Sequence, residues 1–76
     1  MSITPSQCRA ARGLLDMDQT ILAEAAAVSR NVIIDFEKGR RTPGRNNLAA
    51  IKRALEDAGV EFTNGDAPGV RLRKQA

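Results

Sequence analysis

Histidine, tyrosine and tryptophan are absent from this sequence of 76 residues, and cysteine occurs once, at Cys8. A single cysteine excludes an internal disulfide, and without histidine the chain lacks the Cys/His clusters typical of zinc sites. The sequence also has no glycine-rich phosphate-binding loop and no pattern of paired carboxylates, which are other common supports for catalysis. We therefore expect a protein that is not an enzyme and holds no cofactor or metal.

Long apolar segments are also missing. No run approaches the ~18 apolar residues that a membrane-spanning helix requires. The opening stretch "MSITPSQCRAARG" lacks the apolar centre of a signal peptide. The lone thiol suits a reducing compartment. These features predict a cytoplasmic protein with no membrane partner.

Aromatic residues are scarce, since Phe36 and Phe62 are the only two. The other residues of the apolar 42% are mainly aliphatic, and small aliphatic side chains suit helices that approach one another closely. A chain of this length is expected to form one domain. The composition therefore favours an all-α fold.

Positive charge is concentrated in the middle of the chain. Residues 29–53 carry seven basic and two acidic side chains, a net charge of +5, whereas residues 54–69 carry −4 and the tail at 70–76 carries +3. Such a cluster, in a chain of net charge +3, is typical of a surface that binds phosphates. A solvated basic surface is the alternative that charge alone leaves open.

The first two predicted helices begin at recognisable caps. Thr4 and Gln7 form a capping box that starts the first helix, which is expected to end near residues 13–15. Asp18 caps the second helix, predicted over residues 19–26. The side chains expected to face the core are Cys8, Ala11, Leu15, Leu22, Ala23 and Ala26. Cys8 is therefore interpreted as a core residue and not as a reactive thiol.

The third helix is predicted from Arg30 to Lys38. Ser29 is its N-terminal cap, and Gly39 supplies a left-handed stop after its last turn. Pro43 then prevents the helix from resuming at once. The apolar positions expected to meet the core are Val32, Ile33 and Phe36.

A fourth helix, capped by Asn46 or Asn47, is predicted to end at Ala58 before Gly59. Its inward face is expected to consist of Leu48, Ile51 and Leu55. Beyond it, "VEF" and "VRL" alternate apolar with charged residues around the turn formers "TNGDAPG". This pattern predicts two short extended pieces or a β-hairpin, which must pack on the helices or on a second subunit.

The spacing between the second and third helices is the most specific signal. They are separated only by "AVS", and so short a link requires the helices to cross steeply. Close crossing needs a small residue, which Ala23 supplies, and the turn needs an unusual backbone conformation, which we assign to Ala27. Val28 and Ile33 are expected to fill the angle between the helices.

From Cys8 to Leu55 the chain resembles the Cro/repressor-type helix-turn-helix proteins, also called the xenobiotic-response-element family. The strongest parts of the resemblance are "LLDMDQ", "LAEAAAVS", "FEKGRRTP" and "LAAIKRAL". Members usually have glycine where Ala27 stands, and many have a fifth helix that "VEFTNGDAPGVRL" does not resemble. The resemblance implies a lambda-repressor-like bundle of four helices as the DNA-binding domain, residues 1–59, followed by an extended segment and basic tail, residues 60–76.

The resemblance also implies that the third helix enters the major groove of double-stranded DNA. The side chains it places near base edges or adjacent phosphates are Ser29, Arg30, Asn31, Ile34 and Asp35. Arginine can pair with guanine, asparagine with adenine, and a carboxylate can accept from cytosine, while isoleucine can touch a thymine methyl group. The side chains it places on phosphates are Gln19, Lys38, Arg40, Arg41 and Arg45.

Several of these residues have structural alternatives. The resemblance pairs Arg12 with Glu37 between the first and third helices, which we interpret as a structural ion pair. Asp35 could instead hold Lys38 or Arg30 across the helix, Ser29 could be only a cap, and Ile34 could contact a protein partner.

The sequence therefore predicts a sequence-specific, repressor-like transcriptional regulator associated with the nucleoid. A homodimer through residues 60–72 is expected, because Val60, Phe62, Val70 and Leu72 alternate with polar residues. The alternative is a protein-interaction module such as an antitoxin or anti-activator. One exposed apolar patch formed by Ile34 together with the hairpin residues would favour that alternative.

Overall fold

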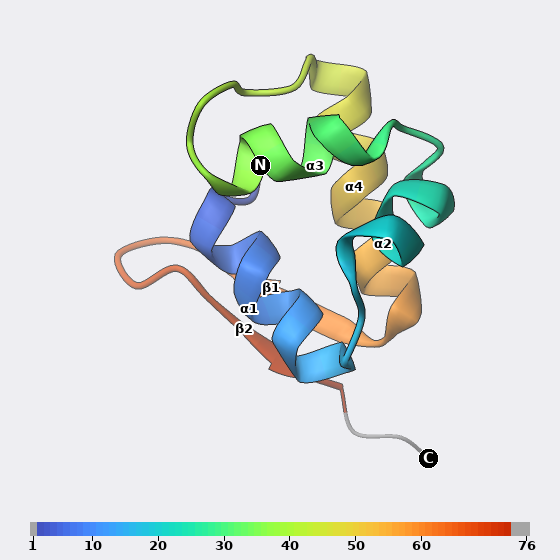
Figure 1. The fold of residues 1–76 in the computed structure, drawn as a ribbon. Helices are drawn as coiled ribbons and strands as arrows, with labels where there is room; N and C mark the ends of the chain where they lie inside the picture. The colour runs from blue at the N-terminus through green and yellow to red at the C-terminus, as the bar shows by residue number, and fades with distance from the viewer. Residues whose placement is uncertain (1, 74–76) are drawn as a thin grey trace.

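The structure, a computed structural model, describes residues 2–73 as four helices and one two-stranded sheet (Figure 1). The last part of the predicted basic tail, residues 74–76, lies outside the described residues. Within residues 2–73 no helix is both long enough and apolar enough to cross a membrane. The elements in chain order are α1 (Pro5–Leu15), α2 (Gln19–Ala26), α3 (Arg30–Glu37), α4 (Arg45–Ala58), β1 (Val60–Thr63) and β2 (Gly69–Leu72).

The predicted capping box starts α1. The backbone N–H of Gln7 donates to Thr4 Oγ1 at 3.1 Å, and the Thr4 N–H donates to Gln7 Oε1 at 2.8 Å. These two bonds satisfy backbone donors that the first turn of a helix leaves unpaired. The helix ends at Leu15, within the predicted range, and Asp16 comes next in a left-handed conformation with φ 52°.

The link between α2 and α3 has the predicted length and the predicted backbone. Ala27 adopts φ 58°, in the left-handed region, and the Val28 N–H donates to the Ala23 carbonyl at 3.0 Å. Ser29 then caps α3. Because only residues 27–29 separate the two helices, α3 turns sharply away from α2 while remaining packed against it (Figure 1).

The end of α3 differs by one residue from the prediction. The last helical residue is Glu37, and Lys38, predicted to lie within the helix, is its C-terminal cap. Gly39 comes next at φ 74°, so the predicted left-handed stop is confirmed.

The prediction for the start of α4 is wrong. Asn46 or Asn47 was expected to cap the helix, but α4 begins at Arg45 and its cap is Gly44, which has no side chain to bond. The Leu48 N–H donates to the Gly44 carbonyl at 2.9 Å, so the backbone alone closes the first turn. An extended residue whose carbonyl accepts this bond is a sufficient cap, and a side-chain acceptor only adds to it.

The domain is mostly helical but not purely all-α, because a β-hairpin comes after α4. The hairpin alternative is thus confirmed, with an antiparallel register that pairs Val60 with Leu72 and Phe62 with Val70. These pairs place the alternating apolar residues of both strands on one face of the sheet. Val60 is buried, Phe62 and Val70 are partly buried against the core, and 51% of Leu72 is exposed.

The helices support this sheet. β2 runs beside α1, and β1 contacts both α1 and α4 (Figure 1). The Gln7 side chain donates from Nε2 to the carbonyls of Thr63, at 3.0 Å, and Gly69, at 2.9 Å. One buried amide therefore joins the start of α1 to both strands.

A single apolar core lies between the helices and the hairpin. Cys8 is fully buried in it, as predicted. Its buried members are Ile3, Cys8, Ala11, Leu22, Ala23, Ala26, Ile33, Phe36, Leu48, Ile51, Leu55 and Val60. Since every helix and β1 contribute to this set, the orientation of α3 is set by packing on several elements at once.

The turn at Ala27 generates a prediction about stability. A residue with a Cβ is strained in the left-handed region, so Ala27→Gly should raise the free energy of unfolding by about 1 kcal/mol. Urea denaturation of the two proteins measures the difference. Gly39→Ala is the matched control, because Gly39 also has a positive φ and an added Cβ there meets nothing within 4 Å. Its effect on stability therefore reports backbone strain alone. Gly39→Ala should lower stability by a similar amount, and a less stable Ala27→Gly protein would contradict the assignment of strain.

Candidate nucleic-acid interface

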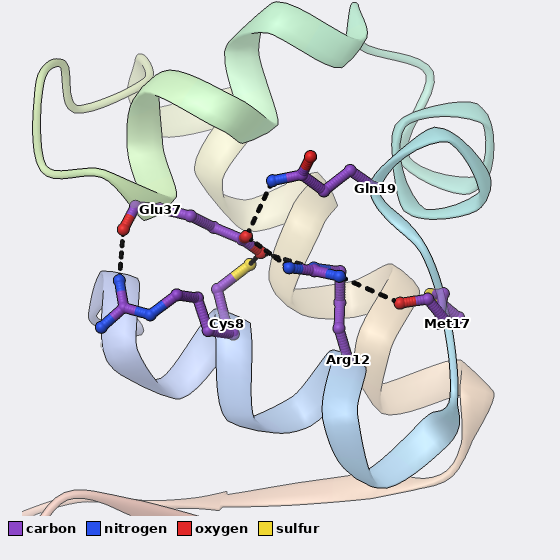
Figure 2. Close-up of polar contacts among 6 residues, drawn as sticks. Cys8, Arg12, Met17, Gln19 and Glu37 are labelled. Atoms are coloured by element: carbon purple, nitrogen blue, oxygen red, sulfur yellow. Dashed lines mark hydrogen bonds and ion pairs between the residues drawn. The ribbon is translucent and has the colours of Figure 1, made fainter.

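A buried carboxylate anchors α3 to the rest of the domain. Glu37 is 3% exposed and accepts two hydrogen bonds from Arg12, at 2.7 Å from Nε and 2.6 Å from Nη2. It also accepts from Gln19 Nε2 at 3.1 Å and from the Cys8 thiol at 3.1 Å. Figure 2 shows these donors converging on one carboxylate from α1 and α2. The ion pair that the resemblance implied between Arg12 and Glu37 is present.

The hydrogen bonds in this cluster determine its ionisation. Burial by itself would raise the pKa of Glu37, but hydrogen bonds from Arg12, Cys8 and Gln19 together outweigh it, and the net pKa lies below the ordinary 4.5. Burial and the neighbouring carboxylate raise the pKa of the Cys8 thiol well above its usual range. Cys8 is therefore a neutral donor to Glu37 and a poor nucleophile.

Two arginines of α1 extend this anchor. Arg12 Nη1 donates to the Met17 carbonyl at 3.1 Å, which joins the α1–α2 link to the same cluster (Figure 2). Arg9 donates from Nη1 to the backbone carbonyl of Glu37 and from Nη2 to Ser6. This role of Arg9 was not predicted from the sequence. Its position three residues before Arg12, on the same face of α1, was the available signal.

The outer side of α3 carries the residues predicted to read bases. Arg30 and Asn31 are exposed, whereas Ile34 and Asp35 are half-buried. Ser29 is exposed, and its hydroxyl accepts from the Val32 N–H at 3.3 Å, so it acts as a helix cap. The structure thus brings all five residues to the cap and outer side of one short helix.

Asp35 has a partner that was not predicted from the sequence. Its carboxylate lies 3.8 Å from Arg40 Nη1, and it makes no ion pair with Lys38 or Arg30. The left-handed Gly39 folds the chain back over the end of α3, so that the Arg40 N–H donates to the Asp35 carbonyl at 2.9 Å. This reversal brings Arg40 beside Asp35, whereas positions along the helix suggested the other two partners.

A shallow groove of about 330 Å³ runs beside the outer side of α3. The residues around it come from α3 and its cap, from the loop at 41–44 and from the start of α4. They are Ser29, Asn31, Val32, Asp35, Arg41, Thr42, Pro43, Gly44 and Asn47. Predicted base-reading residues and a predicted phosphate contact therefore border one polar groove.

Of the four cations predicted to contact phosphates, Arg41 lines this groove and Arg40 pairs with Asp35 at its border. All four are exposed and belong to the end of α3, the loop after it and the start of α4: Lys38, Arg40, Arg41 and Arg45. Gln19 differs from them, because it is half-buried and its amide already donates to Glu37. Its side chain is therefore a member of the anchor, although its backbone N–H lies at the start of α2.

The predicted apolar residues do not form a single exposed patch. Phe62 and Val70 pack against the core, and α1 lies between the hairpin and α3, which carries Ile34 (Figure 1). The condition that would favour a protein-interaction module is thus not met by these residues.

Neither a protein-family model nor a curated protein matches this chain. Within residues 2–73, no group of three or more acidic or cysteine side chains is arranged to hold a metal ion.

The buried anchor predicts a specific dependence of stability on pH. Because the pKa of Glu37 is lowered by folding, its contribution to stability is fully present above about 4.5 and is lost as the pH falls through the pKa of the folded state. Glu37→Gln should therefore be less stable than the original protein by about 3 to 5 kcal/mol at pH 7. This deficit should shrink below about pH 4.5. Urea titrations across the pH range measure it.

Glu61→Gln is the control for this experiment. Glu61 pairs with Arg71 at 2.9 Å on the exposed hairpin, so its loss should change stability by less than about 1 kcal/mol. A Glu37→Gln deficit that stayed constant from neutral to acid pH would show that folding does not lower the pKa of Glu37.

Proposed function

We propose that this protein is a sequence-specific regulator of transcription that binds double-stranded DNA as a lambda-repressor-like helix-turn-helix domain. In this proposal α3 lies in the major groove and the protein acts in a repressor-like manner at the nucleoid. The observation that carries the proposal is the two-sided character of α3. Its inner side is fixed by the core and by Glu37, while its outer side presents polar side chains beside exposed arginines.

The outer side of α3 offers the chemistry that base reading requires. Arg30 and Asn31, both exposed at the start of the helix, can make paired hydrogen bonds to guanine and adenine respectively. Ile34, half-buried beside them, can contact a thymine methyl group. Ser29 contributes mainly by capping the helix. The major groove is wide enough to admit an α-helix, and the eight residues of α3 can reach a few base pairs there.

The positively charged side chains near α3 can contact the phosphates of the DNA backbone. Lys38, Arg40, Arg41 and Arg45 lie beyond the end of α3, where they can reach the strands that border the groove. The backbone N–H groups at the start of α2 can bind a further phosphate, with Gln19 held there by its bond to Glu37. Phosphate contacts from α2 and from the loop after α3 would hold α3 in register with the bases.

One copy of this domain reaches too few base pairs to select a site in a genome, so we propose that two copies bind as a dimer. The hairpin is the proposed dimer element, because both outer edges of its two-stranded sheet lack a neighbouring strand within the described residues. Leu72 is half exposed beside one of these edges. A two-fold dimer would bind an inverted repeat with half-sites about 10 base pairs apart.

Selection of bound duplexes from a random pool, with titration of single-base variants afterwards, tests base reading. Arg30→Ala and Asn31→Ala should each weaken binding by roughly 1 to 3 kcal/mol at one base pair and relax the preference there. An equal loss on every sequence would show that these side chains only contact phosphates. Failure to enrich any sequence would contradict DNA reading and leave the protein-interaction module as the better hypothesis.

Arg41→Ala is the matched control, since it removes one exposed positive charge outside α3. It should weaken binding to selected and random duplexes alike. The slope of log affinity against log salt concentration should fall in magnitude by about 0.9. A loss confined to one base pair would mean that Arg41 reads sequence.

Stoichiometry on a selected duplex tests the dimer. Removing the hairpin is not a usable test, because Val60 belongs to the core and Gln7 binds both strands. Leu72→Glu instead changes an exposed position and should abolish cooperative binding of two copies without unfolding the domain. Ala67→Glu introduces the same charge in the exposed hairpin turn and should leave cooperativity intact. Saturation of one asymmetric site by a single copy would refute the dimer.

A further inference from the structure

Asp35 is an unusual residue for a surface proposed to bind DNA. Between residues 29 and 53 the only acids are Asp35 and Glu37, and Glu37 is buried. Asp35 therefore supplies the one negative charge of this segment that is not buried, in the groove that also contains Asn31 and Arg41. A carboxylate so close to phosphates is repelled by them, which weakens binding to any DNA sequence.

Backbone hydrogen bonds fix the position of Arg40 relative to Asp35, but the ion pair between the two side chains is long. The N–H groups of Arg40 and Arg41 both donate to the Asp35 carbonyl, at 2.9 and 3.4 Å, and fix the loop over the end of α3. The charged groups are 3.8 Å apart, with side chains 63% exposed for Arg40 and 37% for Asp35. Exposed pairs of this kind are weak, so either side chain can change partner.

The two side chains have different alternative partners on DNA. Arg40 can pair with a phosphate of any sequence, whereas the Asp35 carboxylate can accept only from a base donor such as the N4 amino group of cytosine. If Arg40 moves to a phosphate on random DNA, Asp35 is left without a partner next to negative charge. On a site with cytosine at the right position, both groups are paired.

We propose that Asp35 is a specificity-determining residue. It keeps Arg40 from the phosphate backbone unless a base donor replaces Arg40 as the partner of the Asp35 carboxylate. This inference rests on the proposed DNA-binding function. It adds to that function a residue that weakens binding to the wrong DNA sequences. Discrimination of this type comes from a group that penalises the wrong partner more than it strengthens the right one.

Asp35→Asn tests the inference, because it removes the charge and keeps an oxygen that can accept from cytosine. Affinity for random duplex should rise about threefold to fivefold, while affinity for the selected duplex changes little. The ratio of the two affinities should fall accordingly. Because Arg40 gains a phosphate on random DNA, the salt slope there should steepen by about 0.9. Asp35→Ala should raise random binding similarly and also abolish the preference at one base pair.

The same comparison in an Arg40→Ala background tests the coupling between the two residues. If Asp35 acts by retaining Arg40, then Asp35→Asn should raise random binding far less when Arg40 is absent. An equal rise in both backgrounds would overturn the coupling, since simple repulsion between Asp35 and phosphates would explain it.

Asp57→Asn is the control for net charge. It removes one exposed carboxylate at the end of α4, outside both α3 and the proposed dimer element. It should leave the ratio of selected to random affinity unchanged, and a fall as large as that of Asp35→Asn would overturn the inference.

If the original protein selects sites but Asp35→Asn keeps the same ratio, only the role of Asp35 fails. If the original protein prefers no sequence, the proposed function fails with it.

Discussion

The ion pair between Arg12 and Glu37 is the contact on which the arrangement of this domain depends. It joins α1 to the last turn of α3, and Cys8 and Gln19 complete the hydrogen bonds of the carboxylate. A buried charge with its donors in place is tolerated, whereas loss of one partner costs several kcal/mol, about 3 to 5 in comparable pairs. The pair therefore permits few positions for α3 relative to α1, which is the property that a helix used for recognition needs.

Anchoring the last turn of α3 also determines the path of the loop after it. Because Gly39 reverses the chain directly after the anchored residues, Arg40 and Arg41 leave the helix at a defined place beside the groove that Asn31 and Asp35 line. The hairpin lies across α1 from this surface (Figure 1) and shares the core through Val60. The proposed DNA-binding surface and the proposed dimer element thus belong to one packed unit, and a second copy can fix the orientation of two recognition helices without a flexible joint.

Much of the fold could be predicted from residues whose side chains or backbone preferences mark where a helix begins or ends. Thr4 and Ser29 mark helix starts because their hydroxyls accept from the first turn, and Gln7 accepts in return from the Thr4 N–H. Gly39 marks a stop because it tolerates a positive φ. The predicted start of α4 is wrong because Gly44 caps the helix through its backbone, which leaves no side-chain signal. The roles of Arg9 and Gln19 and the pairing of Asp35 with Arg40 depend on elements distant in sequence or on a chain reversal. Such contacts arise from packing: helical periodicity can place Arg9 on the same face as Arg12, but it does not identify the partner on another element.

The most direct test of the central claim, that α3 is anchored from within and reads DNA from outside, is an NMR titration of the ¹⁵N-labelled protein with a selected duplex. The largest shifts should occur in the backbone amides of residues 29–45, while the Arg12 Nε–H signal stays in place because its bond to Glu37 is internal. Unchanged amides over residues 29–45, or displacement of the Arg12 signal before any of them moves, would contradict the account.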